Sequence, residues 1–392
     1  MNRPKKIKVP NFKIVLRPQD KKFILKKTKE VLESNRWTVG TLNLALEKEF
    51  ARYAGCPAVA VSNGGTGLVA ILQALEIPEK SLVICPTLTA PPTAHAILAA
   101  GMRIVFADSS VDDLGLDLDD VKRKLKIYKG KVKAVIAVHI GGWISPRIYE
   151  LNNLCKRAGA YLIEDCAHAL GSSLKGRPAG SVGVAAGYSL FMTKPVPGGE
   201  GGMVTSPSGK IIETIKVIRN YGKNNTGLHV IKGFNYKLSE FNAAVALWAI
   251  KNIGYIVKER QRMAALYDQL FKGLHGASIF NIHHARGSYY KYILILDPRI
   301  NRDRFKRMLL KDYGVEAAGG VYDTLCHEEP FFRSRSGQVL NAKEDFPQAK
   351  RFSQGQVCLP LYLGLRPPEQ RYTARVTRLT LQKLLKSSSG RS

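Results

Sequence analysis

An alternation of short apolar segments with helical segments runs through residues 58–165 and constrains the fold more than any other feature. The apolar segments read VAVS, LVICP, RIVFAD, KAVIAVH and AYLIED. Between them, apolar residues recur at helical spacing, over 66–75, through 94–100, and over 118–128 and 146–158. Short apolar strands joined by helices form a mostly parallel sheet with helices on both faces. The sequence therefore predicts an α/β fold.

The length of the chain allows two domains. It has 392 residues, of which 45% are hydrophobic, enough to bury a large core. We expect a basic N-terminal arm over residues 1–22 and a large α/β domain with two leading helices over 23–257. A smaller C-terminal α/β domain is expected over 258–380, followed by a basic tail over 381–392.

The net charge of +29 is concentrated at the two ends. Residues 1–30 carry eleven Lys or Arg against two acidic residues, and residues 366–392 carry seven against one. Solvated termini are the simplest interpretation, with weak association of these ends with anionic surfaces. The sequence has no recognisable basic helix or zinc module, so we expect no specific binding of nucleic acid.

The chain reads as cytoplasmic. No apolar run approaches the roughly 20 residues that cross a bilayer, and the basic start lacks the apolar segment of a secretory signal. The six cysteines are dispersed, which indicates reduced, mostly buried thiols. Cys166 and His168 lie two residues apart, but two ligands alone make a poor metal site, so we expect no metal.

Two strand ends within residues 161–202 offer a carboxylate and an amine. Asp165 ends the segment AYLIED, and Lys194 ends the apolar strand YSLFMTK, which delivers it into a loop rich in proline and glycine. The carboxyl ends of strands in open α/β sheets face the ligand crevice. Pyridoxal phosphate needs a lysine amine for a Schiff base and an anion beside its ring nitrogen. Each residue alone has a simpler interpretation, but the pair predicts a pyridoxal-phosphate site.

A strand, a glycine turn and a helix start make up VAVSNGGTGLVAILQAL. Backbone amides at such a helix start bind anions, which makes Gly64, Gly65 and Thr66 candidates for holding the cofactor phosphate. Ser189 offers a hydroxyl to the same phosphate, and His168 is placed to reach the phenolic oxygen of the ring. An ordinary glycine turn, a strand serine and a structural histidine are the alternatives.

An ordered set of motifs between about residues 23 and 365 resembles the DegT/DnrJ/EryC1/StrS family of pyridoxal-phosphate-dependent nucleotide-sugar aminotransferases. The motifs are WTVGTLNLALEKEFARYAG, VSNGGTGLVAILQALEI, YLIEDCAHALGSSLKGRPAGSVGVAAGYSLFMTKPVPGGEGG, IRNYG, GFNYKLSEFNAAVAL and CLPLYLGL, with CPTLTAPPTAHAILAAGMRIVFADSS between the second and third. Each motif alone is weak, whereas their order along the chain is specific.

The resemblance implies a fold-type-I transferase and a homodimer whose active sites lie at the subunit interface. Lys194 matches the Schiff-base lysine, Asp165 the partner of the pyridine nitrogen, and His168 the position near the phenolic oxygen. The remaining matches are phosphate contacts: Ser189, Gly65, Thr66, and Asn235, which in relatives reaches the cofactor of the neighbouring subunit.

Two positions depart from the family pattern. Relatives usually carry an aromatic residue over the cofactor ring where this chain has Ala90, and loss of that stacking weakens cofactor binding by about 1 kcal/mol. Gly65 stands where the phosphate turn usually has a hydroxyl. Tyr322 and His327, in GGVYDTLCHEEPFF, fall where relatives place a substrate-facing loop, and core packing is an equal alternative for both.

The implied reaction moves an amino group from an amino acid, glutamate by resemblance, to a keto sugar on a nucleoside diphosphate. A deoxysugar dehydratase is the nearest alternative, but relatives of that type replace the Schiff-base lysine by histidine, and this chain has Lys194. A cofactor-binding regulator or scaffold without turnover is a second alternative, motivated by Ala90 and by the charge of the chain.

Overall fold

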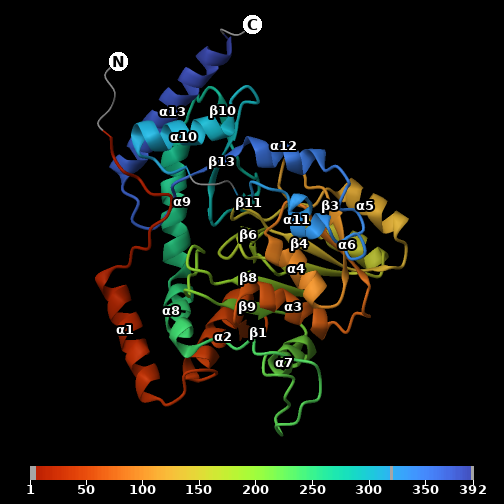
Figure 1. The fold of residues 1–392 in the computed structure, drawn as a ribbon. Coiled ribbons are helices and arrows are strands. Elements are labelled where there is room, and N and C mark those ends of the chain that lie inside the picture. The colour runs from red at the N-terminus through yellow and green to blue at the C-terminus, as the bar shows by residue number, and fades with distance from the viewer. Residues whose placement is uncertain (1–5, 318–320, 390–392) are drawn as a thin grey trace.

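A seven-stranded sheet forms the centre of the molecule, in a computed structural model that describes residues 6–317 and 321–389 (Figure 1). Its strands are β1 (Ala58–Val61), β9 (Gly202–Thr205), β8 (Ala185–Ser189), β5 (Tyr161–Asp165), β4 (Val132–Val138), β2 (Leu82–Pro86) and β3 (Arg103–Ala107), in that spatial order. Within this sheet β9 runs antiparallel to β1 and β8, and the other neighbouring pairs are parallel. The predicted α/β class with a mostly parallel sheet is confirmed.

Helices cover both faces of this sheet, as predicted. Alternate strand residues point to opposite faces, so Val59 and Val61 pack in one core cluster while Ala58 and Ala60 pack in the other. The first face is covered by α3 (Gly64–Ala74), α4 (Pro91–Ala99) and α7 (Gly209–Ile218). The second is covered by α2 (Thr41–Ala54), α5 (Leu118–Ile127), α6 (Ile148–Arg157) and α8 (Glu240–Lys251).

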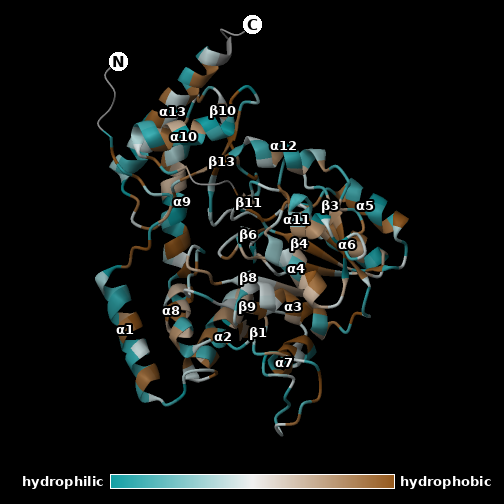
Figure 2. Cartoon of the chain, in the orientation of Figure 1, coloured by the Kyte–Doolittle hydropathy of each residue, from teal (hydrophilic) through white to brown (hydrophobic). Residues whose placement is uncertain are grey.

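A smaller α/β unit follows, built on the antiparallel sheet β10-β12-β13. Its strands are β10 (Ala277–Ile279), β12 (Tyr292–Leu296) and β13 (Gln356–Leu359). Its helices are α9 (Ile253–Leu270), α10 (Arg302–Tyr313), α12 (Pro347–Gly355) and α13 (Pro367–Ser389). The short η1 (Cys326–Glu328) and α11 (Pro330–Arg333) follow α10 in the chain but pack in the core of the large sheet, where Phe332 contacts Phe106 and His95. Hydrophilic residues predominate on α12 (Figure 2). A short third sheet joins β11 (Ala285–Arg286), β6 (Ser173–Leu174) and β7 (Arg177–Pro178).

Both ends of the described chain pack against the rest of the protein, whereas the sequence predicts solvated termini. The helix α13 continues to Ser389, past the expected start of the tail at 381, because Leu381 and Leu384 are buried in the core of the smaller unit. Helix α1 (Pro18–Glu33) begins five residues before the expected position 23. Ahead of α1, Val9 is fully buried and exchanges backbone hydrogen bonds with residues 314 and 316. No helix in the described residues combines the length and the apolar character needed to span a bilayer.

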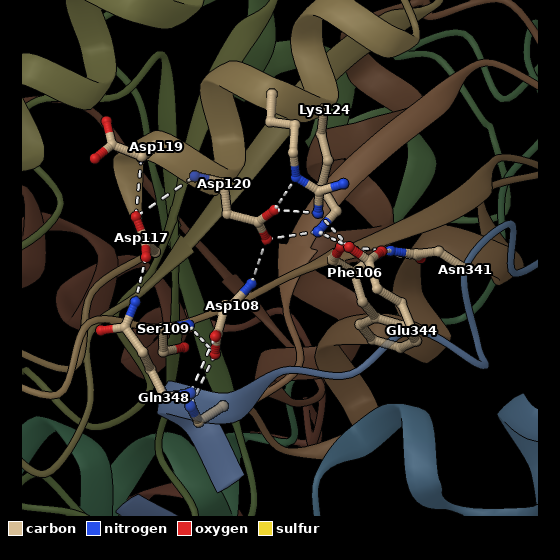
Figure 3. A network of polar contacts seen from close by, with 12 residues as sticks. Phe106, Asp108, Ser109, Asp117, Asp119, Asp120, Lys124, Asn341, Glu344 and Gln348 are labelled. Carbon is tan, nitrogen blue, oxygen red and sulfur yellow. Dashed lines mark hydrogen bonds and ion pairs between the residues drawn. The ribbon is translucent and has the colours of Figure 1, made fainter. Parts of the chain in front are cut away.

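A polar network fastens the segment that precedes α12 to the end of β3 (Figure 3). The ammonium group of Lys124, buried in α5, lies 2.5 Å from Asp120 and 3.3 Å from Glu344. The carboxylate of Asp108, just after β3, accepts from the amides of Gln348 and Ala349 at 3.1 and 2.8 Å. Those amides belong to the first turn of α12, so Asp108 satisfies groups that a helix start leaves unpaired.

We expect Lys124→Ala to lower the free energy of unfolding by about 3 kcal/mol, because it leaves Asp120 and Glu344 close together without their buried cation. Chemical denaturation measures the change. Lys122→Ala is the matched control, since Lys122 lies in the same helix and pairs with exposed Asp119. Equal effects of the two substitutions would contradict the role of the buried network.

Candidate active site

The two carboxylates at the end of β5, Glu164 and Asp165, point to opposite faces of the sheet and make different contacts. Both oxygens of Glu164 accept hydrogen bonds: from His139 at 2.8 Å and from the amides of residues 180, 182 and 183 at 3.1, 2.7 and 2.6 Å. Glu164 thereby fixes the loop that leads into β8. Asp165 is left facing the other side of the strand, at the carboxyl edge of the sheet.

Asp165 is buried and held by two hydrogen bonds. The hydroxyl of Thr93 donates to one oxygen at 2.8 Å, and the amide of Ala167 donates to the other at 3.0 Å. Thr89 in turn donates to the Thr93 hydroxyl at 2.9 Å. Burial raises the pKa of Asp165, while these hydrogen bonds and the charge of Lys194 act in the opposite direction. Such a carboxylate gains from any cationic partner placed against it.

Lys194 lies in the connection between β8 and β9. Strand β8 ends at Ser189, so the segment YSLFMTK is strand only in its first part, and a turn closed by the Lys194 amide and the Phe191 carbonyl carries the lysine. The Lys194 Nζ lies 4.6 Å from the centre of the Tyr290 ring. Burial lowers the pKa of Lys194, and Tyr290 and Asp165 oppose that shift. The amine is therefore easier to deprotonate than an exposed lysine.

The residues predicted to hold the cofactor phosphate lie at the start of α3. The helix begins at Gly64, so the amides of Gly64 and Gly65 occupy the first turn, where helix geometry provides no intrahelical acceptor. A Cβ atom on Gly64 would lie 3.1 Å from the Cβ of Ser189, which places the two residues against each other. Both donors of Thr66 serve the helix cap formed with Asn63. The two glycine amides and the Ser189 hydroxyl are therefore the groups here that a bound anion could use.

His168 lies between two tyrosine rings. Its ring centre is 4.5 Å from that of Tyr290 and 5.5 Å from that of Tyr322, and the Tyr322 hydroxyl is 3.4 Å from its Nε2. Its Nδ1 is buried without a hydrogen-bond partner. Burial and the neighbouring lysines, Lys194 and Lys291, lower the pKa of His168 well below its usual value. The ring is neutral and has one nitrogen available to a ligand.

Two other residues named from the sequence, His327 and Asn235, lie outside this cluster. His327 is buried with its Nδ1 2.5 Å from the Thr87 hydroxyl and its ring against Phe346. Asn235 is exposed on the loop after α7, where its backbone bridges to that of Asn220. Ala90 is half-buried at the position that precedes the first turn of α4, and its backbone lies against the phenol of Tyr322. Tyr322, in contrast, joins the cluster through His168.

Sequence reasoning missed Tyr290 and Thr93. The run SYYKYILIL indicates a strand, and nothing in its pattern shows that Tyr290 lies against the lysine of the other unit. Thr93 is in the segment after β2, and its contact with Asp165 joins residues 72 positions apart. The available signal was only their polarity within otherwise apolar segments.

One buried cluster of three side chains has the residue types of a metal site. Ligand atoms of His139, Glu164 and Cys166 lie within 4.8 Å of one another. Both Glu164 oxygens already accept hydrogen bonds, from three amides and from His139. Because its lone pairs are occupied in this way, we interpret the group as structural and assign no metal to it.

A lysine and a buried carboxylate at the carboxyl edge of a mostly parallel sheet, next to a helix start suited to a phosphate, define the class of fold-type-I pyridoxal-phosphate-dependent transferases. The model of the DegT/DnrJ/EryC1/StrS aminotransferase family matches residues 18–377, and the chain belongs to that family. The family assignment and the pyridoxal-phosphate-dependent aminotransferase activity expected from the resemblance are confirmed.

Individual relatives cover most of the chain. GDP-perosamine synthase of Vibrio cholerae is 32% identical over 327 residues, which is 81% of this chain and 85% of the relative. The dTDP-4-amino-4,6-dideoxy-D-glucose transaminase of Escherichia coli is 28% identical, covering 91% of this chain and 94% of the relative. The crystal structure of DesI, determined in the presence of its TDP-sugar product, superimposes with a TM-score of 0.85 at 27% identity, over 95% and 93% of the two chains.

The residues present fit pyridoxal phosphate. Gly64, in the first turn of α3, lies against Ser189 with no room for a side chain between them, and Asp165 is a buried carboxylate that a cationic partner would stabilise. The unpartnered Nδ1 of His168 is a polar atom that a bound ligand can satisfy. Lys194 supplies the amine.

We expect Thr93→Val to weaken cofactor binding at pH 7 by about tenfold. Loss of the Thr93 hydrogen bond removes stabilisation of the Asp165 carboxylate, so the pKa of Asp165 rises further and its ionised fraction falls. The loss of affinity on acidification should accordingly begin at a higher pH than in the unmodified protein. Titration of the apoprotein with pyridoxal phosphate, followed by absorbance, measures both.

Thr89→Val is the control for this prediction, because Thr89 donates to Thr93 and not to Asp165. Thr93→Ser keeps the hydroxyl and should retain most of the affinity. An unchanged dissociation constant in Thr93→Val at all pH values would show that the hydrogen bond does not influence the cofactor.

Proposed function

We propose that this aminotransferase moves an amino group from glutamate to a keto sugar carried on a nucleoside diphosphate, with Lys194 as its catalytic base. The observation that carries the proposal is the placement of a half-buried amine and a buried carboxylate in one cluster, in a chain of this family. The names of the relatives support the substrate class, since they refer to GDP, dTDP and TDP sugars.

Each residue of the site has a distinct role in this proposal. Bound pyridoxal phosphate supplies an electron sink for the negative charge that develops at the substrate carbon. The Lys194 amine would take a proton from that substrate carbon and deliver it to the cofactor carbon, and the reverse movement would complete the transfer to the acceptor. The lowered pKa of Lys194 favours this role as a base. Asp165 would stabilise the protonated ring nitrogen of the bound cofactor, and the unpartnered Nδ1 of His168 would orient the ring. Gly64, Gly65 and Ser189 hold the phosphate.

Lys194→Ala should abolish both the visible absorbance of the lysine-bound cofactor and amino transfer to a panel of keto sugar nucleotides, because no other amine takes its place. Mass spectrometry of the sugar product and release of 2-oxoglutarate from glutamate measure transfer, and the panel also identifies the sugar. Lys210→Ala, at the start of the remote helix α7, is the control. Persistence of absorbance and transfer in Lys194→Ala would reject the proposed base.

A homodimer completes the proposal. The loop after α7 extends away from the body of the subunit (Figure 1) and exposes apolar residues that a second subunit would cover. These residues are Leu228, Val230, Ile231 and Phe234, which are 65%, 54%, 42% and 45% exposed. Asn235 is exposed at the end of the same loop, where it is free to reach the cofactor of the partner.

We propose that the two units, 23–257 and 258–380, are separate domains connected by the continuous helix α9. Cytoplasmic location is proposed from the class of substrate and from the cysteines, which are all unpaired. Weak association of the basic ends with anionic surfaces remains a prediction from the charge.

We expect Phe234→Glu to shift the protein from dimer to monomer, because the substitution places a charge in an apolar interface. Light scattering at several concentrations measures the mass. Asn235→Ala should leave the dimer intact and raise the cofactor dissociation constant by about tenfold through loss of a phosphate contact. A monomeric unmodified protein with full cofactor affinity would contradict both expectations.

A further inference from the structure

A second lysine lies beside Lys194, and the site described so far gives it no role. Lys291 immediately precedes β12, and its Nζ is 4.9 Å from the centre of the Tyr290 ring, against 4.6 Å for the Nζ of Lys194. The amide of Lys291 donates to the carbonyl of Gly141 at 3.0 Å, which fixes its backbone at the carboxyl end of β4. Lys291 is half-buried and lines a cavity together with Thr193, Tyr290 and Arg260.

The Lys291 ammonium group has no carboxylate partner among residues 6–317 and 321–389. Arg260 adds a third cation, but its guanidinium donates to the carbonyls of Tyr289, Tyr290 and Leu361. Two carboxylates lie in this region. Asp165, whose charge acts on Lys194, is committed to Thr93 and Ala167 and, in the proposed function, to the cofactor ring. Asp323, which acts on Cys358 together with Lys291, is paired with Arg302 and Lys306. The region therefore has an excess of positive charge that an anionic ligand would neutralise.

The excess of positive charge shifts the pKa values of two neighbouring groups, Tyr290 and His168. Against the effect of burial, Lys194 and Lys291 together lower the pKa of the Tyr290 phenol. They also add to the effect of burial in lowering the pKa of His168. Both shifts have the sign expected near uncompensated cations.

We infer that Lys291 binds a carboxylate of the amino-acid donor while the amine of that donor reacts beside Lys194. This inference rests on the proposed function. The amino-acid donor carries a carboxylate next to the carbon that loses its proton, and the keto sugar does not. The Lys291 ammonium group, next to the catalytic amine, would bind that carboxylate and so distinguish the donor from the acceptor. The groups proposed to hold the phosphate are backbone amides at the start of α3 and Ser189, which leaves Lys291 free for this task.

The test compares Lys291→Met and Lys291→Arg with the unmodified holoenzyme. Glutamate added without acceptor removes the visible absorbance of the cofactor, and the concentration at half-maximal loss reports donor binding. We expect Lys291→Met to raise this concentration by roughly tenfold to a hundredfold, the effect of one charge-assisted hydrogen bond, and Lys291→Arg to restore most of it. The KM for the keto sugar should not change.

Glutarate, a dicarboxylate without an amine, provides a readout independent of catalysis. Its calorimetric dissociation constant should rise in Lys291→Met by a similar factor. Lys133→Met is the matched control, because Lys133 is also half-buried but lies at the opposite end of β4. Retained absorbance of the bound cofactor shows that each variant is folded.

The outcomes separate the two ideas. If glutamate and glutarate bind Lys291→Met as they bind the unmodified protein, the inference is overturned and the proposed function stands. If no amino acid removes the absorbance of the unmodified protein, but glutarate binding depends on Lys291, the proposed function fails and the carboxylate site is supported.

Discussion

The docking of residues 288–291 on the end of β4 is the contact on which the site depends. The amides of Ser288 and Lys291 donate to the carbonyls of Gly142 and Gly141, and a Cβ atom on Gly142 would lie 2.5 Å from the Tyr290 nitrogen. Glycine is required there, both for this close approach and for its φ of 98°. The docked segment places Tyr290 and Lys291 against Lys194 and His168, so the smaller unit supplies part of the site.

The site combines buried acidic and basic groups whose pKa values burial shifts in the direction that favours their neutral forms. Burial raises the pKa of Asp165 and lowers those of Lys194 and His168, while the attraction between Lys194 and Asp165 opposes both of their shifts. When burial and charge attraction oppose each other in this way, a charged ligand can change the protonation of these groups with a small change in free energy. A proton-transfer enzyme needs that property in its base and in the partner of its electron sink.

Much of the fold could be predicted from the sequence, because period and composition are local properties. The buried parallel strands appear as apolar runs, and helix starts such as Asn63 before Gly64 are encoded by neighbouring residues. Lys194, Asp165, Ser189 and the glycine turn were also accessible, since each lies at or just beyond a strand end. Element ends were less predictable: α13 extends to Ser389 because of buried leucines that its basic composition conceals.

The sequence by itself determined the class of fold and the set of reactive groups that strand ends bring to one edge. The tertiary structure alone decided which of those groups meet: Tyr290 with Lys194, Thr93 with Asp165, and His327 with Thr87 rather than with the site. The physical reason is that these contacts join residues 72 to 240 positions apart. Tertiary packing sets their geometry, within the large unit for Thr93 and Asp165 and between the two units for the other pairs, and no local pattern encodes it.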